Sequence, residues 1–180
     1  MERYISSLPE EPYVNLTQNN VSDLITIWEY IDQAAKESFR SKYGNIAALI
    51  AVVIDEPLLG AAIRFWDPSH RCFTFNKEDL TPIIEKYSIM VNLKLPSPDK
   101  VYVRKPKLGF RKKLADVLEV KARTLNPPWE QKGCHIGLPW VFLRDFIYNH
   151  LNEENGLAAF ALAIYGLLIF PQVLGHIEVL

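Results

Sequence analysis

The chain carries one long uncharged stretch at residues 155–177, NGLAAFALAIYGLLIFPQVLGHI, in which no side chain is charged if His176 is neutral. Its length of about 23 residues would suffice to span a bilayer. Against a membrane span stand the polar Gln172 and the helix stop at Pro171. A helix that is apolar on all sides is also expected at the centre of a helical domain. We therefore favour a buried central helix and keep the membrane span as the alternative.

Outward from this stretch, the composition is that of a globular protein. The chain has 180 residues, of which 49% are hydrophobic and 23% charged, enough for one domain with a real core. The net charge of −1 gives no general attraction to nucleic acid or to an anionic membrane. Two cysteines, Cys72 and Cys134, are too few for a disulfide framework, and the polar start lacks an apolar signal segment. We expect an intracellular location.

Periodicity and helix signals predict a mainly α fold: a compact multi-helix domain of about six helices with a small β-hairpin of short strands. Residues 1–20, with Pro9 and Pro12, read as an extended N-terminal arm, followed by a single domain over residues 21–180. The predicted helices cover residues 22–39 with Ser22 as N-cap, 57–65, 81–90, 111–123, 139–151 and 156–170. Residues 46–54 are a buried helix or a buried strand, of which we favour the helix. Apolar residues recur on one face of the first helix, at Leu24, Ile27, Trp28, Ile31, Ala35 and Phe39, and we expect Leu114, Val117, Leu118 and Leu125 to face inward. The predicted strands are 72–75, paired with 101–103, and 176–180.

Residues 62–87, AIRFWDPSHRCFTFNKEDLTPIIEKY, combine a Trp-x-Pro turn, an alternating strand and an acidic, threonine-containing helix start. Residues 160–179, FALAIYGLLIFPQVLGHIEV, combine an apolar helix, a Phe-Pro stop and a short strand. Together these stretches resemble the plant mobile domain, a family also labelled "aminotransferase-like", in its divergent branch of domains of unknown function found beside or inside retroelements. The motif residues carrying this resemblance are Trp66, Pro68, Phe73, Phe75, Asp79, Thr81 and Glu85.

The resemblance implies a non-enzymatic interaction or scaffold domain of a transposon-associated plant protein, acting in the nucleus. It also implies that the family's domain runs on past Leu180, so that this chain is truncated at its C-terminus. The helix after Thr81 departs from the family, because residues 90–96, MVNLKLP, lack the usual glycine.

Each motif residue also has a structural explanation that needs no chemistry. We expect the Trp66 indole to be buried at the Pro68 turn, and Phe73 and Phe75 to share one strand face that packs on the next helix. Asp79 and Thr81 would cap that helix.

Known catalytic and cofactor motifs are missing from the sequence. There is no nucleophile elbow, phosphate-binding loop or dinucleotide fingerprint, and no glycine-rich cup for a pyridoxal cofactor. His70, Cys72, Cys134 and His135 lack the usual spacing of zinc ligands, so we expect neither a metal nor a cofactor. The alternative to a scaffold is a cryptic enzyme with a carboxylate-lined cleft near Asp79 and Glu85.

The best lead to function is a basic stretch within 14 positions, with Tyr102 and Phe110 interleaved: Lys100, Arg104, Lys105, Lys107, Arg111, Lys112 and Lys113. Such local density suits phosphate contacts in nucleic acid. It equally suits an acidic protein partner, and a merely solvated face is the third interpretation. We expect a protein partner, with nucleic acid as a further candidate.

Overall fold

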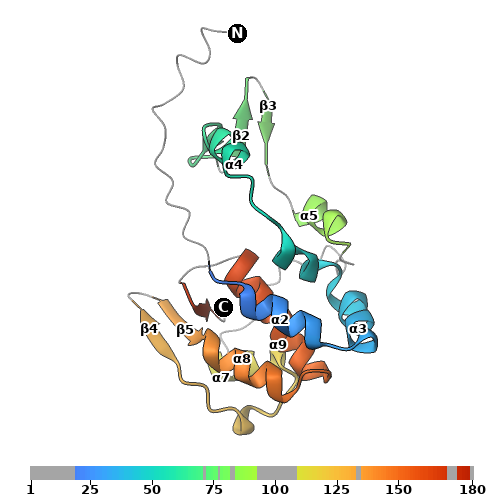
Figure 1. Ribbon diagram of the computed structural model, residues 1–180. Coiled ribbons are helices and arrows are strands. Elements are labelled where there is room, and N and C mark those ends of the chain that lie inside the picture. The colour runs from blue at the N-terminus through green and yellow to red at the C-terminus, as the bar shows by residue number, and fades with distance from the viewer. Residues whose placement is uncertain are drawn as a thin grey trace. The chain divides into compact units, whose positions relative to one another are not determined.

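The computed structural model describes residues 19–70, 72–76, 78–81, 84–92, 109–132, 135–169 and 174–178 (Figure 1). Their contacts define two compact units. The main unit comprises Gln18–Ala51 and Val91–Leu180, and the inserted unit lies between them in sequence at Val52–Met90. Compact units can belong to one domain, so the single domain over residues 21–180 stays a prediction. Most of the expected arm, residues 1–18, lies outside the described part.

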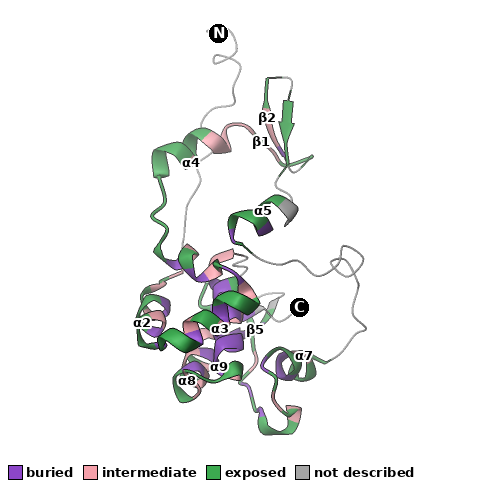
Figure 2. Ribbon diagram, turned by 90° about the vertical axis from the view of Figure 1, so that its right-hand side faces the viewer, coloured by how far each residue is buried: buried purple, intermediate pink, exposed green. Residues whose placement is uncertain are grey.

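The centre of the main unit is α9 (Glu154–Ile164), continued by the π-helical turn η3 (Tyr165–Ile169). Most of its side chains are buried, and Phe160 and Ile164 are fully so (Figure 2). The expected buried central helix is therefore confirmed. Among the described residues, no helix has both the length and the apolar composition that a membrane crossing requires.

Two helices replace the single helix predicted over residues 22–39: α2 (Ser22–Tyr30) and α3 (Gln33–Tyr43). The chain breaks because Ile31 is extended and the Asp32 carboxylate accepts the Ala35 N–H at 2.7 Å, which caps a new helix. The cap residue of α2 is Val21, not Ser22. The predicted apolar face nonetheless survives the break.

The next element, η1 (Ile46–Ala51), is a 3₁₀-helix and ends earlier than the α-helix predicted for residues 46–54. Further along, α7 (Phe110–Val117) ends well before the predicted residue 123, because Glu119 has a positive φ of 55°. A short 3₁₀-helix, η2 (Ala122–Thr124), follows. Leu114, Leu118 and Leu125 are buried as predicted, whereas Val117 is exposed.

The main unit also holds an antiparallel sheet in the order β4 (Glu130–Lys132), β5 (His135–Pro139) and β6 (His176–Glu178). Of these strands the sequence predicted β6 alone. Leu138 and Ile177 are register partners and fully buried. The Ile177 side chain packs on Gly166 of η3, where a Cβ would lie 2.7 Å from it. From β5 the chain enters α8 (Trp140–Asn149), one residue after the predicted start.

The inserted unit contains α4 (Glu56–Ile63), a second antiparallel sheet and α5 (Ile84–Met90). Its sheet has the order β1 (Trp66–Asp67), β2 (Cys72–Phe75) and β3 (Glu78–Leu80). The predicted strand at residues 72–75 is thus confirmed. In the described part, β2 pairs with β1 on one edge and β3 on the other. Residues 101–103, the predicted partner of this strand, lie outside the described residues.

The fold class is mainly α, as the helical periodicity indicated. The described residues hold more helices than the six expected, because short loops and caps divide the predicted ones. Two small three-stranded sheets stand where one hairpin was predicted.

Candidate interaction surface

The basic stretch enters the described structure with α7, at Arg111, Lys112 and Lys113; Lys100, Arg104, Lys105 and Lys107 lie outside the described residues. One face of α7 is anchored in the core of the main unit by Leu114 and Ala115, both almost fully buried. Arg111 and Lys112 are exposed and Lys113 is half-buried. A rigidly held helix therefore presents at least Lys112 to solvent.

Arg111 has a structural role as well. Its Nε donates a hydrogen bond to the Ala122 carbonyl at 2.7 Å, and its Nη2 donates to the Arg123 carbonyl at 3.3 Å. These bonds hold the start of α7 against η2. Because its guanidinium is engaged with the backbone, Arg111 is the least available of the three described cations for a partner.

The electrostatics of the first turn of α7 oppose the charges placed there. The cap residue is Gly109, no side chain caps the helix, and no acidic residue lies in the first turn. The N-terminal end of a helix carries a partial positive charge, so cations there are unfavourable for the helix itself. Lys112 and Lys113 thus add to a local positive potential that favours anionic ligands.

The motif aromatics lie together in the inserted unit. Trp66 and Phe73 are register partners with ring centroids 4.9 Å apart, and Phe75 lies 6.4 Å from Phe73 on the same strand face. Trp66 is 39% exposed, so the expectation of a buried indole is wrong. It lies in a two-residue edge strand, and its aromatic contact there is with Phe73. Pro68 occupies the exposed turn after β1.

The described residues do not show Asp79 and Glu85 lining a common cleft. Asp79 lies in β3, and its Oδ1 accepts a hydrogen bond from Thr74 Oγ1 at 3.0 Å. It therefore pairs across the sheet instead of capping a helix, which corrects that expectation. Thr81 follows β3 and is exposed. Glu85 lies in α5, and its side chain is outside the described structure.

Sequence reasoning missed one pair at the Pro68 turn. His70 Nδ1 and Asp67 Oδ2 are 2.7 Å apart, and Asp67 Oδ1 also accepts the Ser69 N–H at 2.7 Å. The hydrogen bond to Asp67 raises the pKa of His70, and the same bond lowers the pKa of Asp67. The turn residues Asp67, Pro68 and Ser69 were recognisable in the sequence, but the contact of the His70 ring with the Asp67 carboxylate was not.

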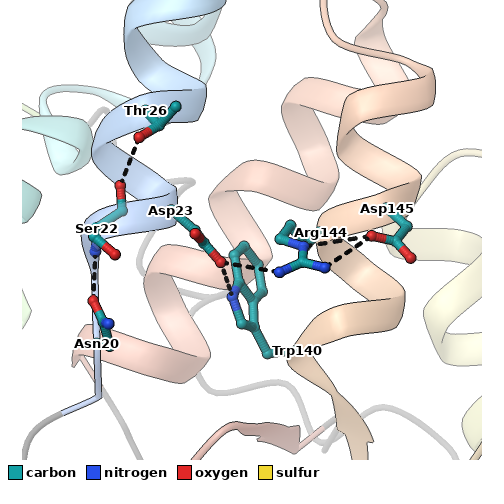
Figure 3. A network of polar contacts seen from close by, with 7 residues as sticks. All are labelled: Asn20, Ser22, Asp23, Thr26, Trp140, Arg144 and Asp145. Carbon is teal, nitrogen blue, oxygen red and sulfur yellow. Dashed lines mark hydrogen bonds and ion pairs between the residues drawn. The ribbon is translucent and has the colours of Figure 1, made fainter.

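A polar network links α2 to α8 (Figure 3). Asp23 Oδ2 accepts hydrogen bonds from Trp140 Nε1 at 3.2 Å and from Arg144 Nη1 at 3.3 Å. The Nη2 atom of Arg144 also lies 3.4 Å from Asp145 Oδ1. The hydrogen bond to Asp23 raises the pKa of the Arg144 guanidinium above its ordinary value. Each charged group thus faces an opposite charge or a donor, which is the pattern of a structural cross-link. Sequence spacing gave no signal for it.

Metal-binding geometry is not found in the described part of the chain: no three His, Cys, Asp or Glu side chains there converge as ligands. His70 instead contacts Asp67, and Cys72 is buried as a free thiol. Cys134 lies outside the described residues.

Comparison with known proteins places the chain in a family. No curated protein and no solved structure matches it. A family model does match, over residues 24–180, which is most of the chain. The chain therefore belongs to the family described as domain of unknown function DUF7745.

Proposed function

We propose that this chain is a non-enzymatic interaction module that contacts nucleic acid or an acidic protein partner through a basic surface. The described cations of that surface are Arg111, Lys112 and Lys113 on α7. The proposal extends it to Lys100, Arg104, Lys105 and Lys107, which precede α7 in the basic stretch and lie outside the described residues. The observation that carries the proposal is the exposed Lys112 on α7, whose opposite face is buried in the main unit. Because the backbone of an anchored helix is already ordered, binding at Lys112 costs mainly side-chain entropy.

The cost of these charges to the helix supports a binding role. Selection for helix stability alone favours Asp or Glu in a first turn. Here the first turn holds cations, with neither an acidic residue nor a side-chain cap. An anionic ligand at Lys112 would relieve this repulsion, so binding and helix stability become coupled.

Binding measurements on the full chain test the proposal. Fluorescence anisotropy would be recorded with labelled duplex DNA, single-stranded RNA and polyglutamate. The variants are Lys105→Glu, Lys112→Glu and Lys113→Glu, singly and combined, with Lys112→Arg as the charge-preserving control. Lys86→Glu in α5 is the matched control, because it makes the same charge change on an exposed residue of the inserted unit.

We expect the triple variant to lose at least about tenfold in affinity for the preferred anion, while Lys86→Glu and Lys112→Arg bind like the parent. For nucleic acid, the slope of log affinity against log salt should fall by about one for each phosphate that the variant no longer neutralises. A preference for polyglutamate over both nucleic acids would select the protein partner. Equal, weak binding by parent and triple variant to all three probes would refute the basic surface.

The resemblance to plant mobile domains supports the biological setting. We place the module in a transposon-associated, nuclear plant protein, and in the divergent retroelement-associated branch of that family. A fluorescent fusion of the full chain in plant cells should accumulate in the nucleus, and a uniformly cytoplasmic signal would contradict this placement.

The enzymatic alternative finds little support in the described residues. Of its two carboxylates, Asp79 is exposed in an edge strand and already accepts a hydrogen bond from Thr74. A general base is expected in a concave site with a perturbed environment. The exposure of Asp79 on a strand edge does not match that expectation.

A further inference from the structure

The sheet of the inserted unit has an acidic open edge. Its order is β1-β2-β3, so among the described strands β3 pairs with β2 alone, and the backbone groups of β3 that point away from β2 have no strand partner there. Glu78, Asp79 and Leu80 of β3 are all exposed. An exposed edge strand is a template on which an extended segment can add by main-chain hydrogen bonds.

The two faces of this edge differ in chemistry. Leu80 is the register partner of Phe73 and extends the aromatic face formed by Trp66, Phe73 and Phe75. On that face Leu80 is 53% exposed and Phe75 is 41% exposed. Asp79 points to the other face, opposite Thr74. Glu78, the register partner of Phe75, lies on the aromatic face with Leu80. An added strand would therefore meet Leu80 and the Glu78 carboxylate on one face and the Asp79 carboxylate on the other.

We infer that β3 is a docking edge for an extended protein segment carrying one apolar side chain opposite Leu80 and Lys or Arg opposite Glu78 and Asp79. Opposite charges facing each other across neighbouring strands stabilise pairing. The Asp79 carboxylate keeps acceptor capacity for this contact, since the bond from Thr74 uses one of about four lone-pair sites.

Charge selects this occupant over two others. Pairing of β3 with β3 of a second copy in antiparallel register brings Glu78 and Asp79 of one chain near those of the other, and like charges facing across strands destabilise pairing. Nucleic acid is disfavoured because its phosphates would approach the same carboxylates. This inference does not depend on the basic surface of α7.

Peptide titration of the isotope-labelled full chain, followed by two-dimensional amide NMR, tests the inference. The probe is a short peptide that repeats the triplet Val-Lys-Lys, so that one register places valine opposite Leu80 and lysine opposite both Asp79 and Glu78. A peptide of the same composition with its lysines in one block tests strand register, and a peptide that repeats Val-Glu-Glu tests charge. A version of the probe with alternate backbone N-methyl groups keeps the side chains but cannot donate along the edge.

We expect saturable shifts of the Glu78, Asp79 and Leu80 amides with the Val-Lys-Lys peptide. Weaker binding is expected with the block peptide, and none with the N-methylated one. The double variant Glu78→Lys with Asp79→Lys should lose at least about tenfold in affinity for the lysine peptide and should now bind the glutamate peptide. Asp79→Asn keeps an acceptor for Thr74 and should lose about two- to threefold in affinity for the lysine peptide. This single variant keeps the inference testable if the double variant does not fold.

Glu56→Lys is the matched control, because it reverses an exposed acid of α4 outside the sheet. Strand addition at β3 is overturned if the shifts with the lysine peptide avoid β3, if the block and N-methylated peptides bind as well as the probe, or if Glu56→Lys weakens binding as much as the β3 variants.

Discussion

At the scale of single residues, Gly156 fixes how α8 leads into α9. A Cβ at this position would lie 1.8 Å from the His150 carbonyl oxygen, which is backbone and cannot swing away. We therefore expect Gly156→Ala to destabilise the main unit by roughly 3 kcal/mol or more, seen as a large fall in the thermal midpoint.

The matched control is Gly60→Ala in α4, where nothing lies within 4 Å of an added Cβ. Because alanine is the better helix former, this variant should gain about 0.5–1 kcal/mol. If both substitutions had equal effects, the tight approach at Gly156 would be contradicted.

The Asp67–His70 pair makes folding stability depend on pH, and the direction follows from the pKa shifts of the two groups. The pKa of His70 is raised above its ordinary 6.5, so the stability that His70 contributes is lost as pH rises through the pKa of the folded state. The pKa of Asp67 is lowered below 3.8, so its contribution is lost as pH falls through the folded value. The pair is therefore fully formed between roughly pH 4 and 6.5.

Titration of the His70 ring protons by NMR checks this. Asp67→Asn removes the charge and should bring the pKa of His70 down toward its ordinary value, whereas Asp55→Asn in the cap of α4 should leave it unchanged. An unaltered His70 titration in Asp67→Asn would show that the pair does not form in solution.

At the scale of elements, Asp32 separates α2 from α3. Its carboxylate accepts the Ala35 N–H, so Asp32→Ala should cost about 1 kcal/mol by removing the cap. Asp32→Asn keeps an acceptor and should be nearly neutral. Chemical denaturation of the two variants compares them, and equal losses would point away from capping.

The same break shows what periodicity in the sequence can and cannot predict. Leu24, Ile27, Ile31, Ala35 and Phe39 are all buried, so the apolar face was predicted correctly. Because the spacing of four continues from Ile31 to Ala35 across the break, it hid the boundary between two helices. Only the cap chemistry of Asp32 marked it.

Short strands and exposure escaped prediction for a different reason. β4 has the sequence EQK, without any alternation of apolar residues. It is a strand because it pairs with β5, and that pairing cannot be read from the three residues alone. In the inserted unit the sequence placed Phe73 and Phe75 on one face, but the exposure of Trp66 depends on what packs over it. Likewise, the density of charge in the sequence was enough to select Lys112 as a candidate contact. The role of Arg111 in holding α7 to η2 could be recognised only once the position of η2 was known.

At the scale of the whole molecule, the chain is highly exposed where it passes from the main unit to the inserted unit. Val52, Val53 and Ile54 have no regular secondary structure, and Val53 is 91% exposed. Proteases that cut after small apolar residues should cleave there first, because exposed, unpaired backbone fits a protease site. Mass spectrometry of early elastase fragments would show this, with Val53→Asp as a slowed control. A first cut inside the buried α9 would contradict the burial pattern.

The main unit is discontinuous in sequence, and this has a consequence for its synthesis. Ile177 is fully buried against Gly166, so the core formed by residues 18–51 is completed only after residue 178 has left the ribosome. The earliest helices must wait, with apolar faces uncovered, while more than a hundred later residues are translated. At about 5–20 residues per second the wait lasts several seconds, long enough for chaperones to bind the nascent α2 and α3.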